Sequence, residues 1–319
     1  MITNKIQPRK ALNKAFLKVK PPRDDIEKFK DNLMRLLNDI NEAESEEFHK
    51  NLISRFLRET YYGANYFINT KGRNDLVIHN GKDAKSSVGV ILEAKKPTNN
   101  AEMLKVDNLN TKALQELVLY FLRDRVSGKN LELKHLIVTN VYEWFIFDAV
   151  TFEKNFAHNQ ELVKQFTDFE EGRLTGKTTD FFYQEIAQSA IASIADEIPF
   201  TYFDLRDYQQ YLKKGENEHQ LIALFKLFSP EHLLKLPLAN DSNTLDKTFY
   251  SELLHIIGLT ETKEGGKKLI QRKTQRDRAS LLENAIAQLD SLDKISRLEK
   301  PEQFGETYQD RLFNVGLEL

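Results

Sequence analysis

The chain has 319 residues, of which 40% are hydrophobic and 29% charged, so it can bury a large core and is not compositionally disordered. It contains no cysteine, which excludes a disulfide framework, a thiolate zinc site and a cysteine nucleophile. Because 46 basic and 48 acidic side chains give a net charge of -2, a nucleic-acid partner has to be argued from local patches. No segment approaches the ~18 apolar residues of a membrane helix, so we expect a cytoplasmic protein without a membrane partner.

A basic arm opens the chain. The first 23 residues contain seven Lys or Arg and no acid, and Pro21-Pro22 end the arm. An acidic run follows in which Ile26, Phe29 and Leu33 keep helical spacing, which predicts a helix to residue 40. A second helix is predicted over residues 48–62.

The next part of the chain alternates strands with one helix. Short β-prone runs at 66–69, 76–78 and 88–92 are separated by turn signals. An amphipathic helix is predicted over 111–125, and two more strands at 136–138 and 144–147. This order predicts an α/β layer with a central sheet.

Beyond residue 155 the pattern is mainly helical. We expect a last strand at 200–203 and place a loose domain boundary near residue 208. Residues 1–208 would form the α/β domain with its basic arm, and residues 209–319 a mainly α-helical connector. The sequence ends within an apolar helical pattern that has no capping signal, so we expect a fragment of a longer polypeptide.

Three charged residues stand at the ends of two predicted strands. Asp75 opens the strand at 76–78, and Glu93 and Lys95 end the strand that follows it. Residues two apart on a strand project from the same face, so Glu93 and Lys95 would converge while Ala94 points into the core. If the two strands pair as a hairpin, Asp75 would join them.

This combination suits the hydrolysis of a phosphodiester. Two carboxylates are the ligands that Mg²⁺ prefers, and a nearby Lys can orient the attacking water and offset charge in the transition state. The structural alternatives are a turn residue at Asp75 and a solvated charge pair at Glu93 and Lys95. Because four apolar residues precede Glu93, its charge lies at the end of a buried strand, where it needs compensation.

These residues resemble the PD-(D/E)xK nuclease superfamily, with Asp75, Glu93 and Lys95 at the motif positions. The resemblance implies a restriction-endonuclease-like core, which is a central mixed sheet flanked by helices. It also implies catalytic roles for those three residues. Some members carry a Gln-x-x-x-Tyr element on the next helix, which suggests Gln115 and Tyr120, although their spacing is one residue longer here and Glu116 keeps the expected interval. The resemblance also implies a further metal-binding acid on the preceding helix.

For that acid we favour Glu47, with Glu46 as the competitor, although acids in a helix's first turn are favoured anyway. The expected metal ligands are therefore Asp75, Glu93 and Glu47, with Mg²⁺ as the ion and Mn²⁺ as a substitute.

Three segments, 69–75, 92–97 and 139–148, resemble the N-terminal region of type IIG restriction-modification enzymes, which fuse an endonuclease to an adenine methyltransferase. The resemblance implies a site-specific deoxyribonuclease used in phage defence. No Asn-Pro-Pro-Tyr signature and no Gly-rich cofactor loop occur here, so methylation and its S-adenosylmethionine would belong to a part beyond Leu319.

A second basic run follows Gly265-Gly266, and we expect it to contact the phosphates of double-stranded DNA. Its members are Lys267, Lys268, Arg272, Lys273, Arg276 and Arg278. Since one such site cuts one strand at a time, we also expect a transient homodimer on DNA. The alternatives are a repair or recombination nuclease of the same superfamily and a catalytically inert DNA-binding scaffold module.

Overall fold

A computed structural model describes residues 4–71, 74–214, 218–236, 247–264, 267–273 and 280–284, although the side chains of Asp75, Lys267 and Lys268 and of some neighbours lie outside this description. The chain divides into two compact units, Met1–Asp241 and Ser242–Leu319. Each unit is described by itself below.

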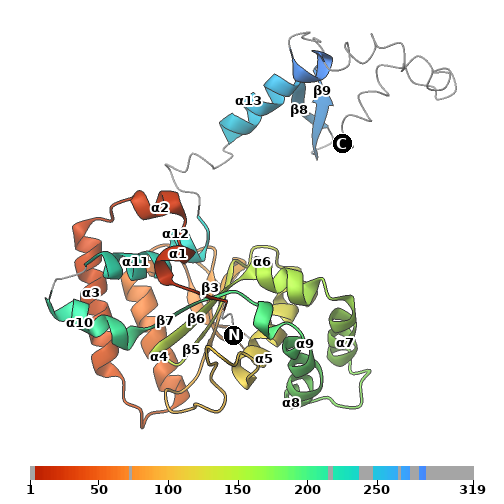
Figure 1. Cartoon of the computed structure of the whole chain (residues 1–319). Helices are drawn as coiled ribbons and strands as arrows, with labels where there is room; N and C mark the ends of the chain where they lie inside the picture. The colour runs from red at the N-terminus through yellow and green to blue at the C-terminus, as the bar shows by residue number, and fades with distance from the viewer. Residues whose placement is uncertain are drawn as a thin grey trace. The chain divides into compact units, whose positions relative to one another are not determined.

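A seven-stranded mixed sheet forms the centre of the first unit (Figure 1). Its order is β1-β7-β6-β5-β4-β3-β2, in which β1 with β7 and β4 with β5 are parallel and the other neighbours are antiparallel. The strands are β1 (Lys5–Ile6), β2 (Ile68–Lys71), β3 (Asn74–His79), β4 (Val88–Ala94), β5 (His135–Thr139), β6 (Glu143–Asp148) and β7 (Phe200–Asp204).

The predicted hairpin is present. β3 and β4 pair antiparallel with Leu76 opposite Leu92 and Ile78 opposite Val90. The backbone of Asp75 therefore lies next to the Leu76–Leu92 pair, at the end of the hairpin where Glu93 follows.

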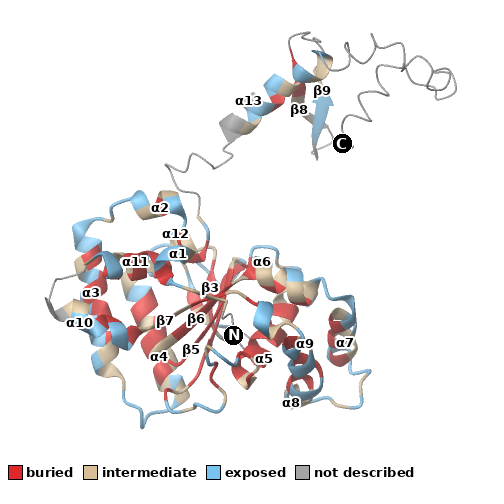
Figure 2. Ribbon diagram, viewed as in Figure 1, coloured by how far each residue is buried: buried red, intermediate tan, exposed pale blue. Residues whose placement is uncertain are grey.

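Helices cover both faces of the sheet, because β4 is apolar on both sides and buried throughout (Figure 2). Along β4, Ile91 belongs to one apolar cluster, and Leu92 and Ala94 to the other. The Ile91 face is covered by α5 (Lys112–Leu122), η2 (Arg123–Ser127), α6 (Ala149–Phe152), η3 (Glu153–Ala157), α7 (Gln160–Glu170), α8 (Thr179–Phe181), η4 (Phe182–Ala187) and α9 (Gln188–Ala192), with the turn η5 (Ala195–Glu197) nearby.

The opposite face packs against helices from both ends of the first unit. They are α1 (Pro8–Ala11), α2 (Lys14–Lys18), α3 (Arg23–Asp39), α4 (Glu46–Leu57), η1 (Arg58–Tyr62), η6 (Leu205–Tyr208), α10 (Gln209–Lys214), α11 (Glu218–Phe228) and α12 (Pro230–Leu233). No helix in the described residues is long and apolar enough to cross a membrane.

The expected α/β architecture, with a central sheet between helices, is confirmed. The expected boundary near residue 208 lies inside the first unit, which extends to Asp241. The reason is that α11 and α12 pack on the sheet: the ring of Phe228 contacts Trp144 of β6 at 4.7 Å between centroids, and Leu224 and Leu233 are fully buried.

The second unit is not purely helical in its described part. It contains α13 (Lys247–Ile257) and an antiparallel hairpin of β8 (Leu259–Glu264) and β9 (Lys267–Arg272). The sequence explains this difference, because two six-residue runs separated by only Gly265-Gly266 are typical of a tight hairpin.

Candidate functional site

β4 ends in a buried pair of opposite charges. Glu93 and Lys95 leave only 2% and 4% of their surface exposed, and Oε1 of Glu93 lies 2.7 Å from Nζ of Lys95. The two side chains share a face, and Ala94 between them packs into the opposite apolar cluster, as the sequence predicted. The Lys95 N–H donates to the carbonyl of Thr139 at 2.8 Å, so sheet pairing fixes the backbone here.

Helix α5 brings a second carboxylate to the same ammonium. Oε2 of Glu116 lies 2.5 Å from Nζ of Lys95, so Lys95 joins carboxylates from a strand and from the helix above it. Glu116 is the one charged residue within positions 113–122, all of which are buried. A single acidic residue within a mostly apolar helix is the sequence signal from which the place of Glu116 in the site could have been predicted.

The charge network continues into the loop before α5. Oε2 of Glu102 lies 3.9 Å from Nζ of Lys95, and Oε1 of Glu102 lies 2.8 Å from Nζ of Lys112. The five residues Glu93, Lys95, Glu102, Lys112 and Glu116 carry three negative charges and two positive ones. The carboxylates and ammonium groups of these side chains compensate one another, and Glu93, Lys95 and Glu116 do so in a buried place.

The electrostatics keep Lys95 charged. Burial is the largest influence on the pKa of Lys95 and lowers it, but Glu93 and Glu116 together outweigh burial and raise the pKa above its usual value. Burial also works to raise the pKa of Glu102, yet hydrogen bonds from Lys112 and Asn99 lower it. Lys95 is therefore an ammonium at neutral pH.

Tyr183 of η4 borders the network, although sequence reasoning missed it. Its side chain is buried, and burial together with the negative charges of Glu116 and Glu93 raises the pKa of its hydroxyl. No sequence signal pointed to Tyr183, because its nearness depends on how η4 packs across α5.

The two predicted α5 residues lie in different surroundings. Gln115 is buried, and its Nε2 donates to Oδ1 of Asn110 at 3.1 Å. Asn110 in turn lines a cavity of about 310 Å³ whose walls include Asp107 and Asp196. Tyr120 is 7% exposed and belongs to the apolar cluster beneath α5. Their proposed catalytic roles stay predictions.

The two acids considered on α4 also differ. Glu47 pairs with Lys50 at 2.7 Å, and its side chain is 62% exposed. Oε2 of Glu46 accepts a hydrogen bond from the backbone N–H of Lys96 at 3.3 Å, directly after Lys95. Of the two, Glu46 is the one that reaches the strand carrying the motif.

The second basic run is only partly described. Lys267 and Lys268 lie on β9, and Arg276 and Arg278 lie outside the described residues. Arg272 forms a double hydrogen bond with Glu283, and Lys273 contacts the ring of His255. Glu283 thus balances the charge of Arg272.

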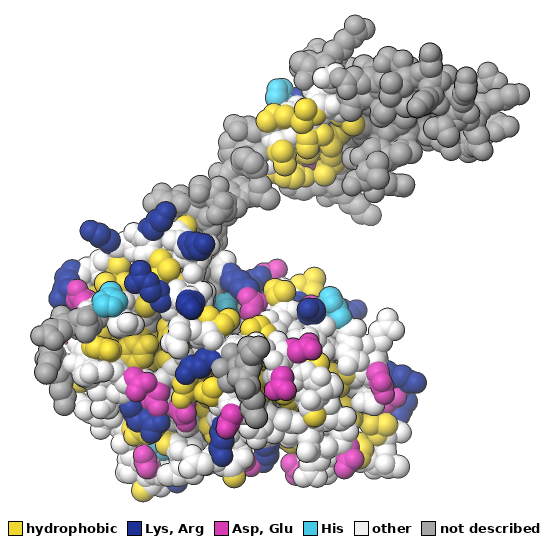
Figure 3. Space-filling model, viewed as in Figure 1, with side chains coloured by type: hydrophobic (Ala, Val, Ile, Leu, Met, Phe, Trp, Pro, Cys, Tyr) yellow, Lys and Arg dark blue, Asp and Glu magenta, His cyan; other side chains and the backbone are white. Residues whose placement is uncertain are grey.

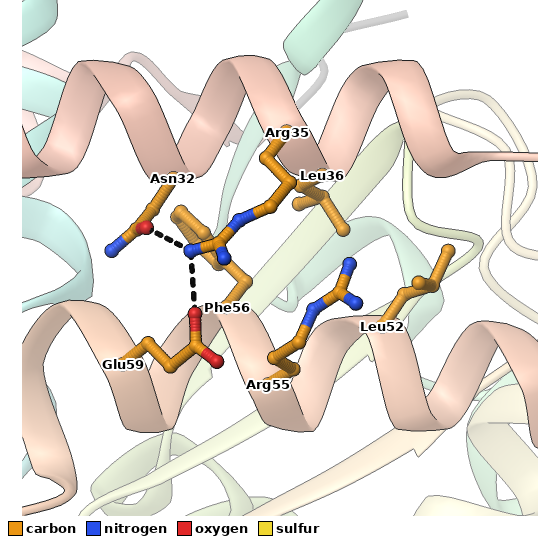
Figure 4. A pocket seen from close by; sticks show the side chains of 7 residues that line it. All are labelled: Asn32, Arg35, Leu36, Leu52, Arg55, Phe56 and Glu59. Atoms are coloured by element: carbon orange, nitrogen blue, oxygen red, sulfur yellow. Dashed lines mark hydrogen bonds and ion pairs between the residues drawn. The ribbon is translucent and has the colours of Figure 1, made fainter.

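A hollow between α3 and α4 contains two guanidinium groups (Figure 4). Arg35 donates to Asn32 and Glu59, as the dashed lines in Figure 4 show, and Arg55 pairs with Asp39. Each arginine already has a carboxylate partner, so this hollow is a helix-to-helix contact with no excess positive charge for an anion.

Chemically, the donor set at the end of β4 fits a hard divalent ion, because Glu93 and its neighbours offer carboxylate oxygens. Among the described residues, however, no group of three or more His, Cys, Asp or Glu side chains is arranged to hold a metal. Asp75, the other ligand predicted on this hairpin, has its side chain outside the described residues.

Two family matches divide the chain at the same place as its two units. Residues 242–319 match a family described as a domain of unknown function (DUF7814). No curated protein and no solved structure matches the chain. Residues 6–241, which are most of the chain, match another family described as a domain of unknown function, and the chain therefore belongs to the DUF7149 family.

Proposed function

We propose that this chain is the endonuclease part of a restriction-modification enzyme and hydrolyses phosphodiester bonds of double-stranded DNA. The observation that carries the proposal is the buried Glu93–Lys95 pair at the end of β4, beside the hairpin partner that bears Asp75. Buried charges are costly, so their placement together at a strand end calls for a chemical reason.

Lys95 acts as a cation in this proposal. Because its neighbours raise its pKa, it stays protonated at neutral pH and serves to orient the attacking water and to offset charge on the phosphate in the transition state. Glu116 then acts as a positioning residue, since its carboxylate holds the ammonium of Lys95 from the side of α5.

The carboxylates of Asp75 and Glu93 would hold Mg²⁺, with Mn²⁺ as a substitute. When bound, the ion supplies Lewis-acid polarisation of the phosphate and a nucleophilic water at neutral pH. Glu46 is the better-placed acid of α4 for an outer role at this site, because it already contacts the backbone of Lys96. Gln115 and Tyr120 remain proposed contributors on α5.

One observation favours a second candidate, an inert DNA-binding scaffold of the same fold. Lys95 already has two carboxylates within 2.7 Å, so the described network could serve stability alone. Cleavage decides between the two candidates, because a structural network would leave DNA intact.

The test is the Mg²⁺-dependent nicking of supercoiled plasmid by the purified chain. Wild type is expected to nick, and Asp75→Asn and Glu93→Gln to lose at least about 100-fold in rate. Glu132→Gln is the matched control, since Glu132 belongs to an exposed pair with Lys134 and its side chain is 61% exposed. A protein that cuts only linear DNA, from its ends, would indicate the repair-type alternative instead.

If the variants nick as fast as wild type, or if circular dichroism shows that only unfolded variants lose activity, the assignment of the site is wrong.

A further inference from the structure

The basic arm, residues 4–22, is a fixed part of the first unit. Its β1 pairs in parallel with β7, and Leu12 and Phe16 are 4% and 7% exposed within the apolar cluster of α3, α4 and α11. The arm is therefore packed against the core of the first unit, and its exposed side chains project from that packed surface.

A buried lysine fastens the arm to α11. Lys226 is 1% exposed, and its Nζ donates to the carbonyls of Phe16 at 2.6 Å, Leu17 at 3.1 Å and Val19 at 2.6 Å. These carbonyls lie at the end of α2, where helices leave backbone acceptors without intrahelical donors, although Phe16 also accepts from the N–H of Val19 at 3.2 Å. Lys226 thus donates to three acceptors at once, and its ammonium group is buried and does not add to the charge of the surface.

The charges of the arm itself point outward. Its exposed cations are Arg9, Lys10, Lys14, Lys18 and Lys20. The arm contains no acid, and none of these five forms an ion pair with a residue that the structure describes. Lys and Arg side chains gather on the surface over α1 and α2 (Figure 3).

The chemistry of this surface fits a phosphodiester backbone better than a membrane. An interfacial helix needs an exposed apolar face to insert among lipids, whereas Leu12 and Phe16 are already buried in the core. Exposed lysines that project from a polar surface are what neutralises phosphates along a duplex and releases its counterions.

We propose that the basic arm is a DNA-backbone-binding surface in which Lys10, Lys14, Lys18 and Lys20 contact phosphates of a duplex. The inference deepens the proposed nuclease function and rests on it for the choice of DNA as partner. α3, of 17 residues and about 25 Å long, separates the arm from the segment where Glu46 meets Lys96.

The experiment measures binding without cleavage. Fluorescence anisotropy of a labelled 30-base-pair duplex is followed in EDTA over a series of salt concentrations, with the full chain and with the quadruple variant Lys10→Gln, Lys14→Gln, Lys18→Gln and Lys20→Gln. Each lost phosphate contact lowers the slope of log K against log salt by about 0.9, so the slope should fall by about 3 to 4 and the affinity at low salt by more than about tenfold.

A matched control removes four exposed lysines elsewhere in the first unit: Lys82, Lys85, Lys154 and Lys164, each changed to Gln. This variant has the same net charge as the arm variant, so it should keep the wild-type slope if the arm is the contact surface. An equal loss in both variants, or no loss in the arm variant, overturns the inference. Binding of the arm to anionic vesicles of phosphatidylserine and phosphatidylcholine, without binding to the duplex, also overturns it.

The two proposals fail separately. If the slope of log K against log salt falls in the arm variant while wild type does not nick plasmid, the arm inference stands and the nuclease proposal falls. If wild type nicks and the arm variant binds the duplex as wild type does, the nuclease proposal stands and the arm inference falls.

Discussion

At the scale of single residues, Lys95 depends on two carboxylates that the fold brings from different elements. Glu116→Gln keeps the shape of one of them and removes its charge. We expect a loss of about 1–3 kcal/mol in the free energy of unfolding, because Lys95 then stays buried with Glu93 as its main partner. Urea unfolding followed by circular dichroism at pH 7.5 measures the loss.

The pH dependence of this loss has a defined sign. The folded state raises the pKa of Lys95, so the stability from its network is complete below the unfolded value of about 10.4 and is lost as the pH rises through the folded value. The difference between wild type and Glu116→Gln should therefore be constant from pH 7 to 9. Glu132→Gln, in an exposed pair, should change stability by less than about 0.5 kcal/mol. A Glu116→Gln protein as stable as wild type contradicts the described network.

His135 offers a second prediction at this scale. Its ring is buried at the start of β5, Nδ1 donates to the carbonyl of Leu233 at 2.8 Å, and the ring of His232 lies 4.9 Å away between centroids. Burial lowers the pKa of His135 to about 4 despite that hydrogen bond, and it lowers the pKa of His232 to about 3.

Since the unfolded chain takes up a proton near pH 6.5 and folded His135 does so only near pH 4, stability is present above pH 6.5 and falls between these values. We expect each of the two histidines to contribute a loss of about 1 kcal/mol for each pH unit from pH 6.5 to 4.5, measured by urea unfolding. His135→Gln keeps a donor for Leu233 and should flatten this part of the profile, while His158→Gln, 68% exposed in its side chain, should not. Parallel profiles for all three proteins would rule out this role for His135.

At the scale of elements, α2 is a helix of only five residues, and Lys226 of α11 binds the carbonyls at its C-terminal end. Lys226→Met keeps the apolar stem and removes one donor from three carbonyls, of which Phe16 retains the N–H of Val19. We expect a loss of about 1–3 kcal/mol in stability and a faster cut by trypsin after Lys18, because unmet buried acceptors favour release of the arm. Lys14→Met, at an exposed position of α2, is the control. Equal trypsin rates in wild type and Lys226→Met would show that the arm is held by other contacts.

Elements whose partners lie nearby in sequence could be predicted, and those joined by long-range packing could not. The β3–β4 hairpin follows from two apolar runs and the Asn80-Gly81 turn signal between them, and it fixed the shared face of Glu93 and Lys95 in advance. The contact of Glu116 with Lys95 spans 21 residues and depends on where α5 docks over the sheet. Helix periodicity shows which face of α5 is apolar, but not which strand residue lies beneath Glu116.

At the scale of the whole molecule, the division of the chain was the feature hardest to predict. The helices after residue 208 have apolar faces that would suit either a connector or the core. In the structure, Leu224 and Phe228 of α11 are fully buried in the cluster beneath the sheet, and this burial extends the first unit to Asp241. The family match to residues 6–241 ends at the same residue.

The central claim is that the end of β4 is a nuclease site, and one comparison tests it most directly: the rate of Mg²⁺-dependent plasmid nicking by wild type, Lys95→Ala and Lys96→Ala. Lys96 is a matched control, because it is the next residue on the same strand end and its Nζ contacts the carbonyl of Ala43 away from Glu93. The double variant Lys95→Met with Glu116→Gln removes one charge of each sign. It therefore leaves no carboxylate of Glu116 buried without Lys95, and the fold should be kept.

The account predicts nicking by wild type and Lys96→Ala at equal rates, and a loss of at least about 100-fold in both Lys95 variants while circular dichroism shows them folded. Folded Lys95 variants that nick as fast as wild type, or a wild-type chain that leaves plasmid intact with Mg²⁺ and with Mn²⁺, would contradict it.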